Sequence, residues 1–504
     1  MAFPFTTGSP FVSLPADLHI LVLSFLTPLD IVSVRLTCKG MVNVTRTRSV
    51  WLDALKRVCL SYAIPFVTYD FPSMTVGELE YAATMPDRFR HAGRGKKSLR
   101  YHILRPLKER CIPIRTEDFG PEGWEVDELE SLAIVPGGRF VLARTLDTLL
   151  VWDLCSDSYK PCLARYGLIE DAFDGRFAWK DAYMSCSDLW YDPANSKMRF
   201  VLDAYNNGLP NESEYSCGSI AYELDLASNP PQLNMLNYLW GSSTLSFAGR
   251  SGNRVIYNGG MIDKIGIWDF EHNTAAAWQD TSQMPPVATE YHVVDNDCKT
   301  RLKAYEIPPF VPVVDHRMPA TTEIRLVQEV TLADFDPDIL VKCRGTEYIN
   351  AASANDFTVL NATIMKRVDE YTDVVTDFVH LYVHSTPGDT PIGRPMKIAQ
   401  TKEIERSTAP KQNDERVTVV SQHGDPKRGE MLVHFTTIGR EEEQQTVYLG
   451  PKKGRFFAKP RDWLDGGGEY DFCPATGRLC VGRVDKNMLY IYDFIPMPSQ
   501  GGRA

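Results

Sequence analysis

The chain has 504 residues, of which 43% are hydrophobic and 24% are charged, and its net charge is −11. That length exceeds what one hydrophobic core usually holds, so we expect two or three domains. The composition is typical of a globular protein and excludes disorder over most of the chain. No uncharged apolar run reaches the ~18–20 residues that a membrane-spanning helix needs, so we expect no membrane partner.

The N-terminus and the cysteines bear on the compartment. Residues 1–10 lack a basic segment, and Pro4 and Pro10 interrupt any apolar one, so we expect no signal peptide. The eleven cysteines are scattered and odd in number. We therefore expect reduced thiols and a cytoplasmic or nuclear location, or both.

Charge is distributed unevenly along the chain. Residues 88–110 hold nine Lys or Arg against one Glu, and the first 110 residues sum to +7, which leaves −18 for the rest. The basic N-terminal part suits an acidic partner, whereas the acidic remainder argues against general nucleic-acid binding.

The first predicted element is a helix that follows residues 13–15. Ser13 is placed as an N-cap, and Pro15 lies early in the first turn, where its missing N–H costs little. One apolar face then follows helical spacing: Leu18, Leu21, Val22, Phe25 and Leu26.

Two more short helices are predicted before residue 60. Thr27 caps the second, Pro28 opens it, and Asp30 lies in its favourable first turn. Residues 38–40 end it, and residues 49–52 begin the third, which Trp51 anchors. Three short helices cannot bury all these apolar faces against one another, so the surplus indicates a surface for another protein.

This run resembles an F-box over roughly residues 11–58. The family pattern has a Leu-Pro opening, an apolar Ser-Phe-Leu segment, an Asp-Ile pair, a Val-Cys-Arg-like segment and a closing Trp. Here it reads Leu14-Pro15, residues 22–26, Asp30-Ile31, residues 36–39 and Trp51. Met41 departs from the pattern, because the family often has a Trp shortly after its Cys. The alternative is a generic helical hairpin that caps a larger domain.

The resemblance implies which residues contact a partner. F-boxes hold the small acidic Skp-type adaptor, and through it a cullin. Carried over by position, the adaptor contacts are Leu14, Pro15, Leu18, Val22, Leu29, Ile31 and Trp51. Phe25, Leu26 and Cys38 are expected to fill the interior of the helical unit.

Residues 59–125 are predicted to form a helical and basic linker, with one short helix over residues 76–84. The basic stretch at residues 88–110 is compatible with a nuclear-import signal or with a site for phosphate or RNA. The plainer interpretation is a solvated helix-and-loop linker. Few aromatic residues interleave the basic ones, so we do not expect a surface that stacks single-stranded bases. We expect Arg94, Lys96 and Lys97 to lie in an exposed loop and residues 101–107 to be packed.

From about residue 129 the apolar pattern changes to that of strands. The same order of turn, apolar strand, Asp-centred turn, apolar strand, aromatic and Asp recurs at residues 135–154, 252–270 and 474–494. Weaker copies lie at 192–225 and 295–308. Plausible strands without the full signature follow at residues 358–364, 378–384, 417–422 and 431–437.

These copies resemble the middle hairpin of a WD-repeat blade, which implies a β-propeller over residues 126–496. Division of residues 129–495 by the ~40–45 residues of such a blade gives about eight units, and long insertions leave seven or six equally open. A pair of β-sandwiches or an irregular β domain is the alternative. The expected fold class is therefore a multidomain α plus all-β protein, with a small three-helix F-box followed by a large propeller-like domain.

Motifs for chemistry are weak. His380 and His384 lie about 13 Å apart if they share a strand, which is too far for one metal. Cys155 with Cys162, and Cys473 with Cys480, lack zinc-knuckle spacing. Gly466-Gly467-Gly468 is followed by Glu469, so it is not a phosphate loop, and residues 441–443 suit a hairpin tip. We expect no catalytic residue, no metal site and no cofactor.

The resemblance implies a function as the substrate receptor of a Skp–cullin–F-box ubiquitin ligase, a non-catalytic subunit whose β domain holds a protein substrate. A Skp-bound scaffold outside any ligase is the second interpretation. An enzyme on a propeller frame is the third, and it requires acids or metal ligands gathered on one face.

Overall fold

The protein is described by a computed structural model. The described residues are 14–62, 64–92, 103–114, 129, 131–145, 148–154, 162–167, 182–186, 190–192, 197–206, 217–241, 245–251, 253–259, 264–279, 287–288, 292–297, 301–323, 326–331, 339–343, 357–367, 374–384, 396–402, 411–414, 417–423, 431–437, 445–449, 470–483 and 488–496.

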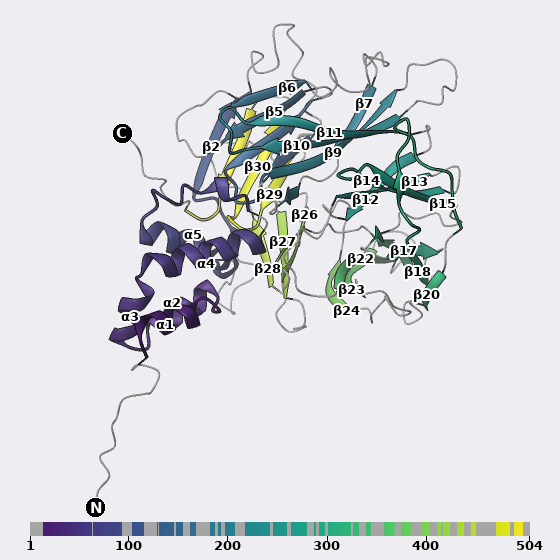
Figure 1. The fold of residues 1–504 in the computed structure, drawn as a ribbon. Helices are drawn as coiled ribbons and strands as arrows, with labels where there is room; N and C mark the ends of the chain where they lie inside the picture. Colours follow the sequence, from purple (N-terminus) through teal and green to yellow (C-terminus); the bar gives the residue numbers. More distant parts are fainter. Residues whose placement is uncertain are drawn as a thin grey trace, which may run out of the picture.

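The N-terminal part is a helical unit, drawn in purple in Figure 1. Its elements are α1 (Ala16–Leu23), α2 (Pro28–Arg35), α3 (Lys39–Thr45), α4 (Arg48–Ser61), the 3-10 turn η1 (Phe66–Thr68) and α5 (Val76–Ala92). The sequence predicted the first, second and fourth of these helices. It missed α3, because the break at residues 38–40 also starts a new helix.

Capping explains two of the helix starts. The Thr27 hydroxyl accepts from the Asp30 backbone N–H at 3.3 Å and donates to the Asp30 carboxylate at 2.7 Å, which confirms Thr27 as the α2 cap. At α5, Thr75 and Glu78 form a reciprocal capping box. That helix runs to Ala92, past the expected end at residue 84, and Pro86 lies inside it.

Arginine side chains join the helices of this unit. Arg35 on α2 pairs with Glu80 on α5 through two hydrogen bonds of 2.9 and 2.8 Å. The same guanidinium lies 5.4 Å from the ring centre of Trp51, whose indole N–H donates to the Thr45 carbonyl at 2.6 Å. Arg57 on α4 donates to the Leu26 carbonyl at 2.9 Å, just after α1. These contacts fix α1 and α2 against the longer helices.

The remainder is β-sheet, and in the described residues its strands form seven separate sheets. The first holds β3 (Ser131–Ile134), β4 (Phe140–Arg144), β5 (Thr148–Asp153) and β6 (Ala164–Gly167). The second holds β7 (Ala182–Cys186), β8 (Trp190–Asp192), β9 (Lys197–Asn206), β10 (Cys217–Asp225) and β11 (Gln232–Gly241). The third holds β12 (Leu245–Ser251), β13 (Arg254–Gly259), β14 (Lys264–Asp269), β15 (Thr274–Gln279) and β19 (Val311–Pro312).

The remaining four sheets follow in chain order. The fourth holds β16 (Val287–Ala288), β17 (His292–Asp297), β18 (Arg301–Glu306) and β20 (Leu326–Thr331). The fifth holds β21 (Ile339–Cys343), β22 (Phe357–Arg367), β23 (Val374–His384) and β24 (Met396–Lys402). The sixth holds β25 (Lys411–Asp414), β26 (Val417–His423), β27 (Met431–Thr437), β28 (Gln445–Leu449) and β1 (Ile103–Leu104). The seventh holds β29 (Tyr470–Cys473), β30 (Arg478–Arg483), β31 (Met488–Asp493) and β2 (Lys108–Pro113).

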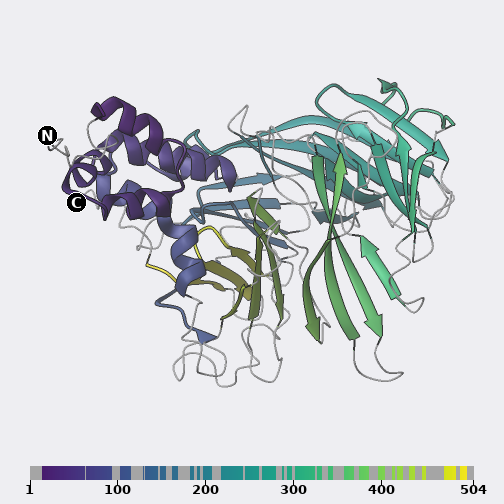
Figure 2. The same cartoon turned by 90° about the horizontal axis from the view of Figure 1, so that it is seen from below.

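Neighbouring sheets pack side by side. The first strands of the seventh and first sheets, β29 and β3, contact each other, and so do β12 and β16 of the third and fourth. The Asp471 carboxylate accepts from the Ile134 N–H at 2.7 Å across the first of these junctions. At these two junctions the sheets meet through β29, β3, β12 and β16, each an end strand of its own sheet, which leaves the opposite end strand of each of these four sheets at the far edge. This propeller-like arrangement confirms the expected fold class. It differs from the alternative, in which two stacked sheets form a sandwich (Figures 1 and 2).

Two strands come from the segment that was expected to be linker. β2 pairs antiparallel with β31 over six residue pairs, and β1 pairs parallel with β28. The seventh sheet is thus completed by a strand from the N-terminal side of the chain. The expected start of the β domain at residue 126 leaves out both strands, because pairing of residues 103–113 with residues 448–493 has no local sequence signal.

A repeated ion pair marks the hairpins that the sequence singled out. An Arg at the start of the second strand faces an Asp at the end of the third: Arg139 with Asp153 at 2.9 Å, Arg478 with Asp493 at 2.5 Å, and Arg254 with Asp269 at 3.9 Å. In the second sheet, Arg199 and Glu223 take this place at 3.1 Å. The Asp of the recurring pattern therefore closes its own hairpin.

The helical unit and the β region share one hydrophobic core. Buried residues of α4, such as Leu55, belong to the same cluster as Leu132 of β3 and Cys480 of β30. The contact is made at two equivalent turns, residues 135–139 and 474–477. A Cβ atom on Gly137 would lie 2.5 Å from Ile64, and one on Gly477 would lie 2.5 Å from the Phe89 ring. Both glycines have positive φ, so the turns favour glycine for their backbone as well.

Residues 307–323, which we call the strap, leave the fourth sheet between β18 and β20 and run along the third. β19 within the strap pairs with β15, and Thr322 donates to the Ala277 carbonyl at 2.8 Å. Ile307 and Phe310 pack against the core of the third sheet. Val313 and Met318 pack where the second and third sheets meet.

Candidate protein-binding site

Apart from Leu60 on α4, the exposed large apolar side chains described in the helical unit lie just before α1, on α1, and just after the ends of α1 and α2. Their exposed fractions are Leu14 36%, Leu18 45%, Leu21 55%, Val22 39%, Phe25 80% and Leu36 82%. We call this set the α1–α2 surface. Exposed apolar residues gathered on one small unit mark an interaction surface more often than they arise by chance.

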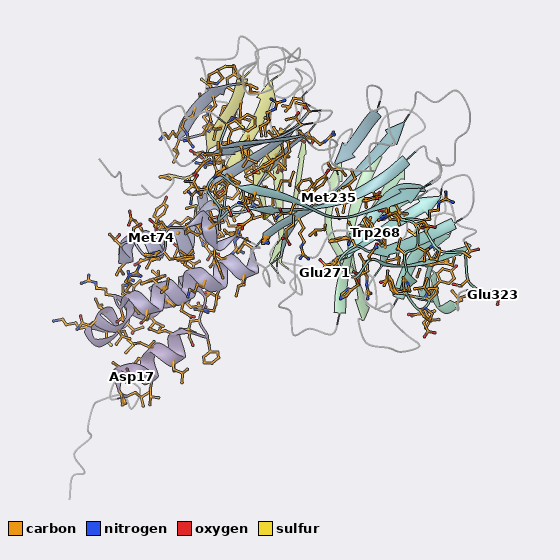
Figure 3. The ribbon with its side chains drawn as sticks, turned by 45° about the horizontal axis from the view of Figure 1, so that its top comes forward. Asp17, Met74, Met235, Trp268, Glu271 and Glu323 are labelled. Atoms are coloured by element: carbon orange, nitrogen blue, oxygen red, sulfur yellow. The ribbon has the colours of Figure 1, made fainter. Side chains whose placement is uncertain are left out.

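The position of this surface leaves it open. Figure 3 shows Asp17 of α1 at the end of the helical unit that lies farthest from the β sheets, whereas Met74 lies nearer to them. The face of the unit that packs on the β region uses α4, α5 and η1 instead. A partner can therefore bind α1 and α2 without displacing the β region.

The surface is held rigid from behind. Leu23 and Ile31, on the inner sides of α1 and α2, are 2% and 0% exposed. The Arg57 guanidinium donates to the Leu26 carbonyl at the end of α1, and the Arg35–Glu80 pair ties α2 to α5. The apolar side chains are therefore presented on a fixed frame, which lowers the entropy cost of binding.

The structure divides the predicted contact residues into two groups. Leu14, Pro15, Leu18 and Val22 are exposed, and Leu29 is half-buried. Ile31 and Trp51 are both 0% exposed, so in this structure they support the surface from the interior, and their direct contact with an adaptor stays a prediction. Ile31 faces inward because α2 packs on α3 and α5, and Trp51 is enclosed by Arg35 and Thr45.

Residues expected inside the helical unit also differ from the prediction. Phe25 is 80% exposed, so the expectation that it fills the interior is wrong. It follows the end of α1 at Leu23, where the chain has left the helical spacing that predicted an inward direction. Leu26 is half-buried and packs against the core, and Cys38 is half-buried. Phe25 and Leu36, the two most exposed members, were missed because a periodic pattern cannot locate the helix end.

Other candidates for chemistry do not gather into a site within the described residues, where no group of three or more metal-ligating side chains occurs. His380 and His384 share strand β23, as predicted. Cys59 and Cys480 are free, and burial raises the pKa of both thiols. Cys155, residues 441–443 and residues 466–468 lie outside the described residues, as do Arg94, Lys96 and Lys97. No helix in the described part is long and apolar enough to cross a membrane.

A family comparison identifies the helical unit. Residues 11–53 match the model of the F-box domain, and this segment contains the whole α1–α2 surface. The chain therefore carries an F-box domain, which is followed by a large, propeller-like β region.

Two similar solved structures come from fission yeast. The WD40 domain of SCAP is 8% identical with a TM-score of 0.35, and covers 74% of this chain and 83% of its own. The complex of the SREBP–SCAP binding domains gives 10% identity, a TM-score of 0.34, and coverage of 67% and 95%. A search of curated proteins finds no match.

Proposed function

We propose that this protein is the substrate-recognition subunit of a Skp–cullin–F-box ubiquitin ligase. The α1–α2 surface binds a Skp-type adaptor and, through it, a cullin, while the β region binds a protein substrate for ubiquitination. The observation that carries the proposal is that the F-box segment presents Leu18, Leu21 and Phe25 to solvent, on and just after α1. Figure 3 shows Asp17 of this helix at the end of the helical unit away from the β region.

The chain's part in such a ligase is positioning. Because α5 and η1 are packed into the turns at residues 135–139 and 474–477, a substrate on the β region is held at a fixed place relative to the adaptor. Holding two reactants close supplies rate without a catalytic side chain. The helices occupy the end of the sheets that carries these turns. We place substrate binding at the opposite end, where β4 turns into β5 and β30 into β31.

The test is affinity purification of the tagged full chain beside the variant Leu14→Ala with Pro15→Ala. Wild type should recover a Skp-type adaptor and a cullin, and the variant should recover less of both. Val314→Ser is the matched control, because Val314 is 69% exposed but lies on the strap. Equal recovery by both variants and wild type would remove the F-box assignment of this surface.

A scaffold that binds the adaptor outside any ligase is the second candidate, favoured by the same surface. Recovery of the adaptor without a cullin would select it. For either function we propose that the protein lies in the cytoplasm, the nucleus or both, where it would bind the adaptor. Imaging of a tagged copy tests this location.

A further inference from the structure

The outer strands of the seven sheets fall into two classes. An outer strand exposes a row of backbone N–H and C=O groups that can pair with another chain, and charged side chains discourage this. Four outer strands carry charge: β2 (Lys108, Glu109, Arg110), β6 (Arg165), β20 (Glu329) and β24 (Lys397, Lys402). Within the described part of the chain, no further strand pairs with these four.

The other three outer strands carry no charged residue, and each is contacted by a segment from elsewhere. β28 pairs with β1. β15, with the sequence Thr-Ala-Ala-Ala-Trp-Gln, pairs with β19 of the strap. β11 is met by the tip of the strap, where the His316 ring stacks on Tyr238 at 3.8 Å between centroids and its Nδ1 lies 3.3 Å from the Tyr238 carbonyl oxygen.

The strap forms backbone hydrogen bonds along the edge of β15 that faces away from β14, one near each end of that strand. The Val313 N–H donates to the Asn273 carbonyl at 2.9 Å, next to the start of β15, and the Thr322 N–H donates to the Ala277 carbonyl at 2.8 Å. These outward carbonyls are the groups that an added strand would use. Ala275, Ala276 and Ala277 are 0%, 2% and 6% exposed.

The strap is anchored by side chains on both sides of the third sheet. Phe310 lies under the Arg254 guanidinium, 4.7 Å from its ring centre, and Met318 fills the space beside Gly266. Between these anchors the chain turns through Asp315 and His316, whose φ values are 52° and 56°. Positive φ at such residues costs of order 1 kcal/mol or more, so the turn persists because its surroundings hold it.

We propose that the strap is an edge guard, which keeps β15 and the adjoining part of β11 from pairing with the same strands of a second copy of this chain. Uncharged, alanine-rich β15 would otherwise offer a flat edge, and two copies could join it antiparallel in a self-complementary contact. This role is independent of adaptor and substrate binding.

The test is sedimentation of the full chain over a hundredfold concentration range. The variant Val313→Pro with Thr322→Pro removes the two backbone donors to Asn273 and Ala277, since proline has no N–H. Wild type should remain one species, whereas the variant should shift to dimers and larger species as concentration rises. Adding Thr274→Lys, which places a charge at the start of β15, should restore the wild-type profile. Val314→Ser should sediment as wild type does.

Two results overturn the proposal. One is a proline variant with a wild-type circular dichroism spectrum that remains a single species at every concentration. The other needs no variant: in wild type the amide hydrogens of Val313 and Thr322 should exchange at least tenfold more slowly than they do in the denatured chain. Equal rates would show that the strap does not hold the edge. A proline variant that fails to fold leaves this second measurement to decide.

Discussion

Arg478 shows how a single side chain can join parts of this chain that lie far apart in sequence. It is 2% exposed, its Nε donates to Asp493 at 2.5 Å, and its Nη1 donates to the Gly138 carbonyl in the first sheet. Arg110 of β2 lies 3.5 Å from the same Asp493. One carboxylate therefore serves the seventh sheet, the strand that completes it and, through Arg478, the turn that receives the helices.

Asp493→Asn should lower the free energy of unfolding by about 3–5 kcal/mol, because it leaves a buried guanidinium without its counter-charge. Chemical denaturation of the full chain measures this. Asp17→Asn, on the exposed side of α1, is the control and should change stability by less than about 1 kcal/mol. Equal losses in the free energy of unfolding for the two variants would mean that the buried Arg478–Asp493 pair does not stabilise the fold.

Trp51 plays the corresponding part in the helical unit, where it is fully buried under Arg35. Trp51→Ala should cost about 3–5 kcal/mol, from the lost burial and the cavity that remains. Leu36→Ala, at an 82% exposed site, should stay within about 0.5 kcal/mol in the same denaturation experiment. A larger loss of stability for Leu36→Ala than for Trp51→Ala would contradict the role of Trp51 as a core residue.

At the scale of elements, the sequence predicted what depends on neighbours along the chain. The hairpins β4–β5, β13–β14 and β30–β31 were predicted because turn residues, apolar strands and a closing Asp follow one another closely. α3, the full length of α5, and the partners of β1, β2 and β19 were not predicted. The strand partners are decided by pairing with residues that are distant in sequence. The capping box of Thr75 and Glu78 at the start of α5, in contrast, is a local signal.

Gly477 and Gly77 test the contact between the helices and the β region. Gly477→Ala forces a side chain into φ +62° and against Phe89, so it should destabilise the protein by more than about 1 kcal/mol. Gly77→Ala lies in α5 with nothing within 4 Å and should stabilise it by about 0.5–1 kcal/mol. Thermal unfolding measures both. Changes in stability of the same sign for the two variants would contradict the packing of Phe89 on the turn that holds Gly477.

For the whole molecule, the shared core makes the helical unit and the β region one body (Figure 2). The division at residues 11–58, 59–125 and 126–496 stays a prediction, with the difference that β1 and β2 belong to the β sheets. The sequence could locate the F-box and the hairpins. It could not reveal that Ile64, Thr68 and Phe89 close over the first and last sheets, because that contact exists only after the chain has folded.

Two fragments test how far the stability of the β region depends on the helical unit and on β1 and β2. A fragment of residues 103–504 keeps β1 and β2, whereas one of residues 126–504 loses both and leaves β31 with an unpaired edge. We expect the full chain to unfold in one transition, the longer fragment to melt at a lower temperature, and the shorter one to aggregate. Equal melting temperatures of the three proteins, measured by circular dichroism and light scattering, would refute the shared core.

The most direct test of the central proposal is a calorimetric titration of the purified full chain with a purified Skp-type adaptor. Wild type should bind with one site. Leu18→Ser with Phe25→Ser should weaken the dissociation constant at least tenfold, since burial of each side chain contributes about 1.5–3 kcal/mol. Val314→Ser should bind as wild type does. No binding by wild type, or equal binding by the Leu18 and Phe25 variant, would contradict the proposal that the α1–α2 surface holds the adaptor.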